Sequence, residues 1–95
     1  MASTKDYLCF CLEQLNPLNI TYKKMMGEYL LYCNNVLFGG IYDDRLLVKI
    51  TNTNNSYNME EELPYQGAKK MYLVKDIDNK ELLKEIIINT VEGLK

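Results

Sequence analysis

The sequence predicts an α+β fold in two layers, with an antiparallel sheet of about five strands packed against N- and C-terminal helices. Apolar residues recur at helical spacing near both ends of the chain. Between these ends, strand-length runs of aliphatic and aromatic residues are separated by two-residue turns. The chain has 95 residues, of which 47% are hydrophobic and 25% are charged. This length and composition are typical of one globular unit, so we assign residues 1–95 to a single domain.

The first helix is expected over residues 3–15. Ser3 or Thr4 can cap it, because a hydroxyl oxygen accepts a hydrogen bond from an unpaired N–H of the first turn. Pro17 prevents its continuation. Its apolar face contains Leu8, Cys11, Leu12 and Leu15.

Four consecutive strands are expected next, forming an antiparallel meander. They cover residues 21–26, 28–33, 36–42 and 45–51, and a last strand follows at 71–75. Asn34-Asn35 and Asp43-Asp44 supply two-residue turns, because Asn and Asp tolerate the positive φ that such turns need. Residues 52–62 are polar and predict a loop with room for one helical turn.

The turns define a register that divides the side chains between two faces of the sheet. One face has no charge and is the expected core face: Leu30, Tyr32, Leu37, Gly39, Ile41, Leu46, Val48 and Ile50. Gly39-Gly40 lies inside a strand, where glycine indicates a bulge or the close approach of another backbone. We expect a helix to cross the core face over Gly39, and a bulge at this pair would reverse part of the assignment.

The last helix is expected from an Asp78 cap to about Leu94. Glu81 at the third helical position would complete a capping-box-like arrangement. Its apolar stripe should lie on the sheet and consists of Leu82, Leu83, Ile86, Ile87, Val91 and Leu94.

The absence of histidine removes several chemistries. Ser-His-Asp and Cys-His catalysis, histidine metal ligands and a histidine pH switch are all excluded. Cys9, Cys11 and Cys33 are expected to be buried, reduced thiols. Glu60-Glu61-Glu62 could hold a metal or a basic partner, but three adjacent carboxylates more often form a solvated face. We therefore expect no catalytic residue, no metal, no cofactor and no enzyme activity.

The charge pattern also restricts the partners. The net charge is −2, and Arg45 is the only arginine. Nucleic-acid-binding proteins usually concentrate basic residues in a patch, so we expect no direct binding to nucleic acid. No apolar run approaches the ~18 residues that a membrane span requires. We therefore expect a cytoplasmic protein without membrane contact.

The second sheet face mixes charged residues with large apolar side chains, which is more apolar surface than a solvated face requires. Contiguous apolar patches of this kind often mark interaction sites, where tyrosine is enriched. The candidate interaction surface consists of Tyr29, Leu31, Phe38, Tyr42 and Leu47. The alternative is that the N-terminal helix or the 52–62 loop covers this face.

Three segments together resemble the TfoX N-terminal domain family, whose members are competence-regulator-like proteins. The segments are KMMG at 24–27, LFGGIYDDRLLVK at 37–49 and LPYQGAKKM at 63–71. The resemblance covers most of the chain and implies a two-layer α+β fold and a regulatory role. Longer members act with a transcription activator and carry a second domain. Many members have Phe-Gly-Gly after the first methionine, where Met26-Gly27-Glu28 stands here.

Two functional hypotheses follow. The first is a non-catalytic regulatory module that binds a protein, such as a transcription factor, or a second copy of itself. The alternative is a small-ligand-binding protein or minor enzyme, with a pocket between the sheet and the C-terminal helix.

Overall fold

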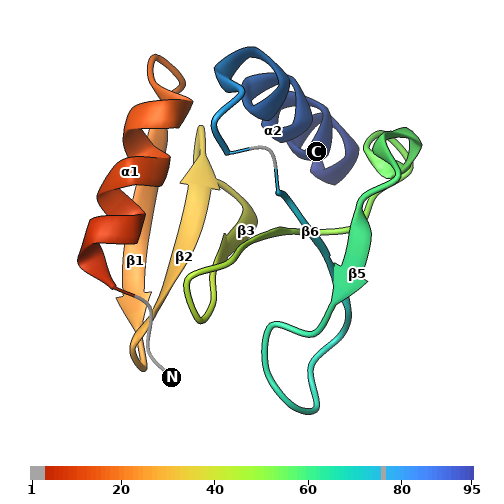
Figure 1. Ribbon diagram of the computed structural model, residues 1–95. Coiled ribbons are helices and arrows are strands. Elements are labelled where there is room, and N and C mark those ends of the chain that lie inside the picture. The colour runs from red at the N-terminus through yellow and green to blue at the C-terminus, as the bar shows by residue number, and fades with distance from the viewer. Residues whose placement is uncertain (1–3, 76) are drawn as a thin grey trace.

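A computed structural model describes residues 4–75 and 77–95 and confirms the α+β fold (Figure 1). The elements in chain order are α1 (Lys5–Leu15), β1 (Ile20–Met25), β2 (Glu28–Cys33), β3 (Val36–Ile41), β4 (Leu46–Val48), a short 3₁₀ helix (Asn55–Tyr57), β5 (Glu60–Glu62), β6 (Met71–Leu73) and α2 (Lys80–Leu94). All strand pairs are antiparallel, in the order β1-β2-β3-β4-β6-β5. The described residues thus form six strands, because the predicted 52–62 loop ends in β5.

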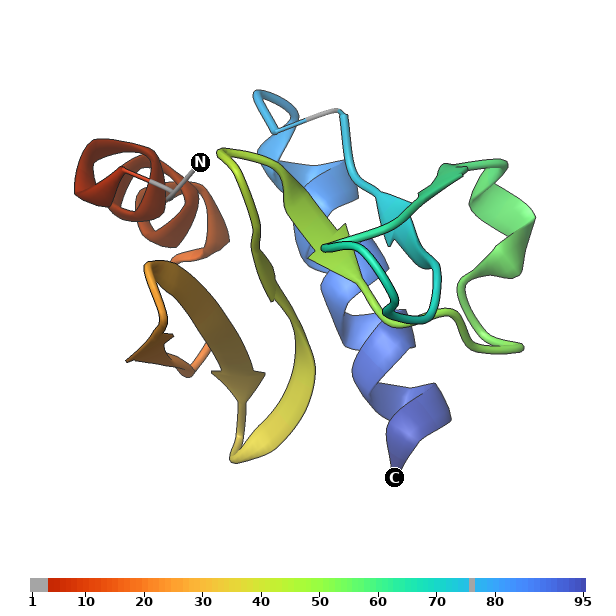
Figure 2. The same ribbon diagram turned by 90° about the horizontal axis from the view of Figure 1, so that it is seen from below.

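Both helices contribute to one core against the sheet. In Figure 1 and Figure 2, α1 lies over the β1–β2 hairpin, while α2 lies across the middle of the sheet. The helices contact each other, and Gln14 of α1 donates a hydrogen bond of 2.7 Å to the carbonyl of Ile77 just before α2. The buried helix residues in this core are Leu8, Cys11 and Leu15 of α1 and Leu83, Ile86, Ile87 and Val91 of α2. The sheet is thus covered by both helices on one face.

Three two-residue turns join the first four strands. Both residues of each turn have positive φ: 51° and 85° at Met26-Gly27, 50° and 67° at Asn34-Asn35, and 54° and 55° at Asp43-Asp44. This is the backbone of a type I′ turn, which matches the right-handed twist of the flanking strands. The two turns predicted from Asn and Asp pairs are confirmed, and Met26-Gly27 is a third.

A β-bulge at Phe38 reverses part of the predicted face assignment. Leu31 pairs with Gly39 and Tyr32 pairs with Leu37, so Phe38 is an extra residue in β3. Leu31 and Phe38 are fully buried in the core, whereas Tyr32 is only half-buried. The core positions predicted for Leu30, Tyr32, Leu37 and Ile50 are therefore wrong, and those predicted for Ile41, Leu46 and Val48 are correct.

Close approach of a backbone explains Gly39, as predicted, but the backbone belongs to β4 rather than to a helix. A Cβ atom on Gly39 would lie 2.1 Å from the carbonyl oxygen of Leu47 and 2.8 Å from the Cα of Val48. Any side chain at this position would push β3 and β4 apart. Glycine is therefore required by the spacing of the two strands.

The helix caps differ in part from the prediction. Thr4 caps α1, with its hydroxyl accepting a 3.2 Å bond from the N–H of Tyr7, while Ser3 lies outside the described residues. Asn79 caps α2, and its side-chain oxygen accepts from the N–H of Leu82 at 3.1 Å. The predicted Asp78 cap is wrong, and Glu81 becomes the second helical residue. The predicted capping-box-like arrangement, which needs Glu81 at the third helical position, therefore does not form.

Buried Asn54 ties the loop after β4 to α2. Its side-chain nitrogen donates to the Lys49 carbonyl and to the Thr90 hydroxyl, both at 2.8 Å, and its oxygen accepts from Thr51 N–H at 2.9 Å. Asn89 of α2 donates to the Tyr57 hydroxyl at 2.6 Å. These bonds satisfy the polar groups that the contact buries. The chain from 49 to 57 is thereby held against the C-terminal half of α2.

The thiols are not all buried as predicted. Cys11 and Cys33 are buried, but Cys9 is exposed, because it lies on the outer side of α1. Cys11 contacts Tyr7 one turn earlier, and burial is the main cause that raises the pKa of Cys11 to about 11. Burial, followed by the nearby Cys11, raises the pKa of Tyr7 to about 12.

The spacing of β3 and β4 predicts a large effect of Gly39→Ala. The added methyl group clashes with the β4 backbone, so we expect a loss of at least about 3 kcal/mol of unfolding free energy, or no folded protein. Gly67→Ala is the control: an added Cβ there meets nothing within 4 Å, and only its φ of +88° opposes it. Left-handed strain costs about 1–2 kcal/mol. Urea unfolding measures both, and equal losses would contradict the close approach.

The raised pKa values of buried Tyr7 and Cys11 predict a lower unfolding free energy in alkali. The ordinary pKa values are 10.0 and 9.0, so the unfolded chain releases these protons before the native protein does. The unfolding free energy should therefore be level below about pH 8.5 and fall from about pH 9 upward. Urea midpoints across this range test the expectation. Tyr7→Phe should give a shallower fall, and an identical fall would remove Tyr7 from the explanation.

Candidate functional site

The five residues predicted as an exposed interaction surface are all buried. Tyr29, Leu31 and Phe38 belong to the core under the helices, because the bulge places them on that face. Leu47 lies on the opposite face, since its neighbours Leu46 and Val48 belong to the core and side chains alternate along a strand. Its side chain nevertheless has no exposed area. The assignment of these residues, with Tyr42, to an accessible patch is therefore wrong.

On the opposite face, a segment that neither alternative named, residues 63–70, lies against Tyr42. The N-terminal-helix alternative is correct for the β2 part of the predicted patch, because α1 covers the hairpin that carries Tyr29 and Leu31. The Tyr42 ring folds back over Gly40, where an added Cβ would lie 2.9 Å from the ring. Tyr65 lies against Tyr42, with ring centroids 6.2 Å apart and planes tilted by 49°. Pro64 beside it is buried. The Tyr42 ring, with Tyr65 beside it, therefore shields Gly40 from solvent.

Arg45 holds this segment in place. Its Nη1 donates to the Glu62 carboxylate at 2.6 Å, its Nε donates to the Tyr42 carbonyl at 3.1 Å, and its Nη2 approaches the Pro64 carbonyl at 3.5 Å. The side chains of this ion pair are only 29% and 33% exposed, so water screens it less than a surface pair. The only arginine of the chain thus joins the β3–β4 turn to both ends of the Glu62–Pro64 stretch.

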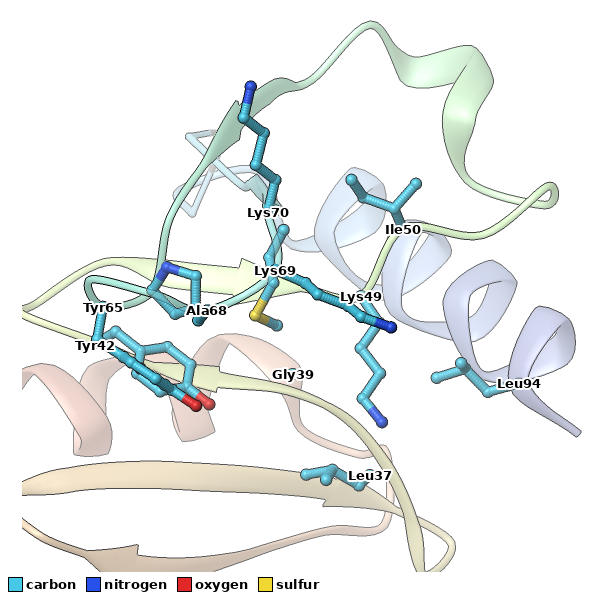
Figure 3. Close-up of a pocket in the computed structure, with 12 residues that line it drawn as sticks. Leu37, Gly39, Tyr42, Lys49, Ile50, Tyr65, Ala68, Lys69, Lys70 and Leu94 are labelled. Atoms are coloured by element: carbon cyan, nitrogen blue, oxygen red, sulfur yellow. The ribbon is translucent and has the colours of Figure 1, made fainter.

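A cleft of about 550 Å³ lies between the 63–70 segment and the exposed parts of β3, β4 and α2 (Figure 3). Its lining residues come from four separate parts of the chain: Leu37, Gly39, Tyr42, Lys49, Ile50, Pro64, Tyr65, Ala68, Lys69, Lys70, Met71 and Leu94. The backbone of Gly39 forms part of its floor. The 63–70 segment forms one wall of the cleft. A turn in this segment is closed by a hydrogen bond of 3.2 Å from the N–H of Ala68 to the carbonyl of Tyr65.

The cleft is cationic in an acidic protein. Three of its lining residues are lysines, and none is Asp or Glu. Lys49 is half-buried, and Figure 3 shows its side chain and that of Lys69 extending over the same part of the cleft, while Lys70 points away. Positive charges gathered around low-dielectric walls attract anions more strongly than scattered charges do. The cleft is therefore suited to an anionic group.

Two phenol groups face the same space. Figure 3 shows the hydroxyls of Tyr42 and Tyr65 directed to the same side of the cleft. Burial is the main cause that raises the pKa of Tyr42 above its ordinary value of 10.0. A protonated phenol hydroxyl can donate a hydrogen bond. The rings also supply an apolar wall. Together these groups can recognise an anion attached to an apolar body.

Large apolar side chains at and beside the cleft remain in contact with solvent. Ile50 is 42% exposed, Leu63 is 45% exposed and Tyr65 is 63% exposed. Apolar surface grouped around a concave site is typical of binding surfaces. We name the cleft together with these three residues the lysine cleft.

Sequence reasoning misses the lysine cleft for an identifiable reason. Lys69-Lys70 is visible as a basic pair and Leu63–Gly67 as a turn-rich segment, but no local pattern shows that they fold over Lys49. The pocket that the alternative hypothesis predicts between the sheet and the C-terminal helix also does not coincide with the cleft. Core side chains of α2 pack there, and α2 reaches the cleft only through Leu94.

The three glutamates at 60–62 do not line the cleft, and two of them make ion pairs within the protein. Glu62 pairs with Arg45, and Glu60 accepts a 2.6 Å hydrogen bond from Lys75 of the next segment. Among residues 4–75 and 77–95, no three His, Cys, Asp or Glu side chains are grouped to hold a metal ion. These two glutamates of β5 therefore serve as ion-pair partners.

Comparison with known proteins gives a consistent family assignment. The family model described as TfoX N-terminal domain matches residues 12–93. An uncharacterised 12.7 kDa protein from the trpE 5′ region of Spirochaeta aurantia is 32% identical over 80 residues, which cover 81% of this chain and 70% of that protein. Neither helix in the described part of the chain has the length and apolar character needed to cross a membrane.

The Arg45 contacts predict that Arg45→Gln loosens the 63–70 segment. We expect a loss of about 1–2 kcal/mol of unfolding free energy, because a partly buried Glu62 loses its charged partner. Trypsin should then cut faster after Lys69 and Lys70. Glu60→Gln, which removes the exposed Lys75 pair, should cost less than about 1 kcal/mol and leave this cleavage unchanged. Equal cleavage in both variants would contradict the role assigned to Arg45.

Proposed function

This chain belongs to the TfoX N-terminal domain family, and from that premise we propose that it is a non-catalytic regulatory module that binds another protein through the lysine cleft. The family supports the regulatory part of the proposal. The partner is a protein of the gene-regulation machinery, such as a transcription factor, in the cytoplasm. The module acts by binding that partner and does not convert a substrate.

The single observation that supports this proposal best is the composition of the lysine cleft. It combines three lysines, two tyrosines and exposed aliphatic residues around a concave surface. Tyrosine is one of the residues that most often contribute large binding energies at protein interfaces. Leu63, the chain neighbour of lining residue Pro64, is also exposed, which favours a ligand with an extended surface.

The chemistry of the lining favours binding over catalysis. Acid–base catalysis can use lysine or tyrosine, but it most often uses a carboxylate or an imidazole placed beside the reacting group. The lining residues include neither, and they include no cysteine or serine nucleophile. Lysine and tyrosine are suited to holding an anion by charge and hydrogen bonds.

The cleft volume favours a second candidate function, the binding of a small anionic molecule. At about 550 Å³ the cleft lies within the range of ligand pockets, which is roughly 300–1,000 Å³. In this alternative the module senses a metabolite-sized anion and needs no protein at the cleft. The two candidates differ in whether the exposed apolar residues beside the cleft become covered.

Capture of binding proteins with matched lysine variants tests the proposal. The immobilised protein is exposed to native lysate and the retained proteins are identified by mass spectrometry. Lys49→Gln with Lys69→Gln should reduce retention of the specific partner by about tenfold, because two charge-assisted contacts are lost.

Lys23→Gln with Lys24→Gln is the matched control. These lysines lie on β1, at the far edge of the sheet order, and the double substitution removes the same two charges. Retention by this variant should equal that of the original protein. Equal losses in both variants would indicate a general charge effect and contradict a specific role for the lysine cleft.

A further inference from the structure

The structure assigns a chemical class to the partner element: we infer that the lysine cleft takes an extended acidic segment of a protein, with an aromatic or large aliphatic side chain beside its carboxylates. This inference rests on the proposed function and specifies which part of the partner is bound. Three features of the cleft support it. They are the state of its lysines, the apolar groups next to them and the exposed residues around it.

Within the described part of the chain, the lysines of the cleft have no ion-pair partner, whereas four other basic residues do. Arg45, Lys75, Lys84 and Lys95 each lie within 2.6–3.6 Å of a glutamate oxygen. Among the described residues, no carboxylate lies at ion-pair distance from the cleft lysines: Lys49, Lys69 and Lys70. Their charges are therefore available to carboxylates from outside. Complementary charge of this kind guides the approach of a partner and fixes its register.

Apolar side chains lie directly beside these charges. Leu37, Met71 and Leu94 are half-buried in the cleft lining, and Figure 3 shows Leu37 and Leu94 near the amine ends of Lys49 and Lys69. A carboxylate alone would leave this surface in contact with water. An adjacent aromatic or aliphatic side chain would cover it and gain roughly 25 cal/mol for each Å² of apolar surface removed from water. The ligand is therefore expected to carry both kinds of group.

An extended segment fits the surroundings better than a small molecule or a nucleic acid. Leu63 is exposed beside the cleft but does not line it, so a ligand confined to the cleft leaves it in water. A long phosphate backbone needs a broad basic surface, but this protein has 13 acidic and 11 basic residues. A short acidic segment needs only the two or three lysines that the cleft supplies.

Selection from a displayed library of random short peptides tests this inference with no need to identify the partner first. The full chain is immobilised, and bound peptides are sequenced and compared with the unselected library. We expect enrichment of Asp and Glu together with an aromatic or large aliphatic residue. Affinity should fall by about tenfold or more for Lys49→Gln with Lys69→Gln, and it should fall with added salt.

The control is again Lys23→Gln with Lys24→Gln, which should bind the selected peptides as the original protein does. Circular dichroism and urea midpoints show whether each variant is folded. Should Lys49→Gln with Lys69→Gln fail to fold, Lys69→Gln with Lys70→Gln replaces it, since both of these side chains are exposed.

The remaining outcomes distinguish a failure of the acidic-segment inference from a failure of the proposed function. Neutral or basic peptides that bind at the cleft overturn the acidic-segment inference and leave the proposed function in place. Acidic peptides that bind equally to the Lys49 and Lys69 variant do not use the lysine cleft and overturn both. A third outcome is that no peptide is selected, while inorganic phosphate shifts the nuclear magnetic resonance signals of the 63–71 region. That result overturns both and favours the small-anion candidate.

Discussion

The close approach of β3 and β4 at Gly39 is the constraint on which the rest of the structure depends. A Cβ atom at this position would lie 2.1 Å from a carbonyl oxygen of β4, so only glycine permits the spacing. The bulge at Phe38 immediately precedes it and shifts the register with β2 by one residue. Because side chains alternate along a strand, this shift places Leu31 and Phe38 under the helices. It also leaves the opposite face to be covered by a later part of the chain.

That cover connects the fold to the proposed activity. Arg45 lies beside the turn that follows β3 and binds both Glu62 and the backbone near Pro64. The segment anchored in this way places Tyr65 against Tyr42 on the outer face and brings Lys69 to the same cleft as Lys49. The lysine cleft is thus a consequence of how the protein covers the second face of its sheet. The same residues that complete the fold provide a cationic surface with exposed apolar neighbours.

Local patterns predict the elements well, because helices, turns and caps depend on neighbouring residues. The Asn34-Asn35 and Asp43-Asp44 turns and the Thr4 cap follow from the chemistry of those side chains. The faces of β2 and the cleft could not be predicted, because both depend on long-range contacts. The Phe38 bulge changes the register without a unique local signal, and the Arg45–Glu62 contact joins residues 17 apart in the chain. The turn-based register therefore assigns Leu31 and Phe38 to the wrong face.

Hydrogen–deuterium exchange on the complex with a selected peptide, or with the captured partner, tests the central claim most directly. Exchange slows where binding covers the backbone or suppresses local opening. If the lysine cleft is the binding site, backbone amides of residues 65–71 should exchange more slowly in the complex, while those of β1 should be unchanged. Slower exchange in β1 or on the outer surface of α1, with no change over residues 65–71, would contradict the account.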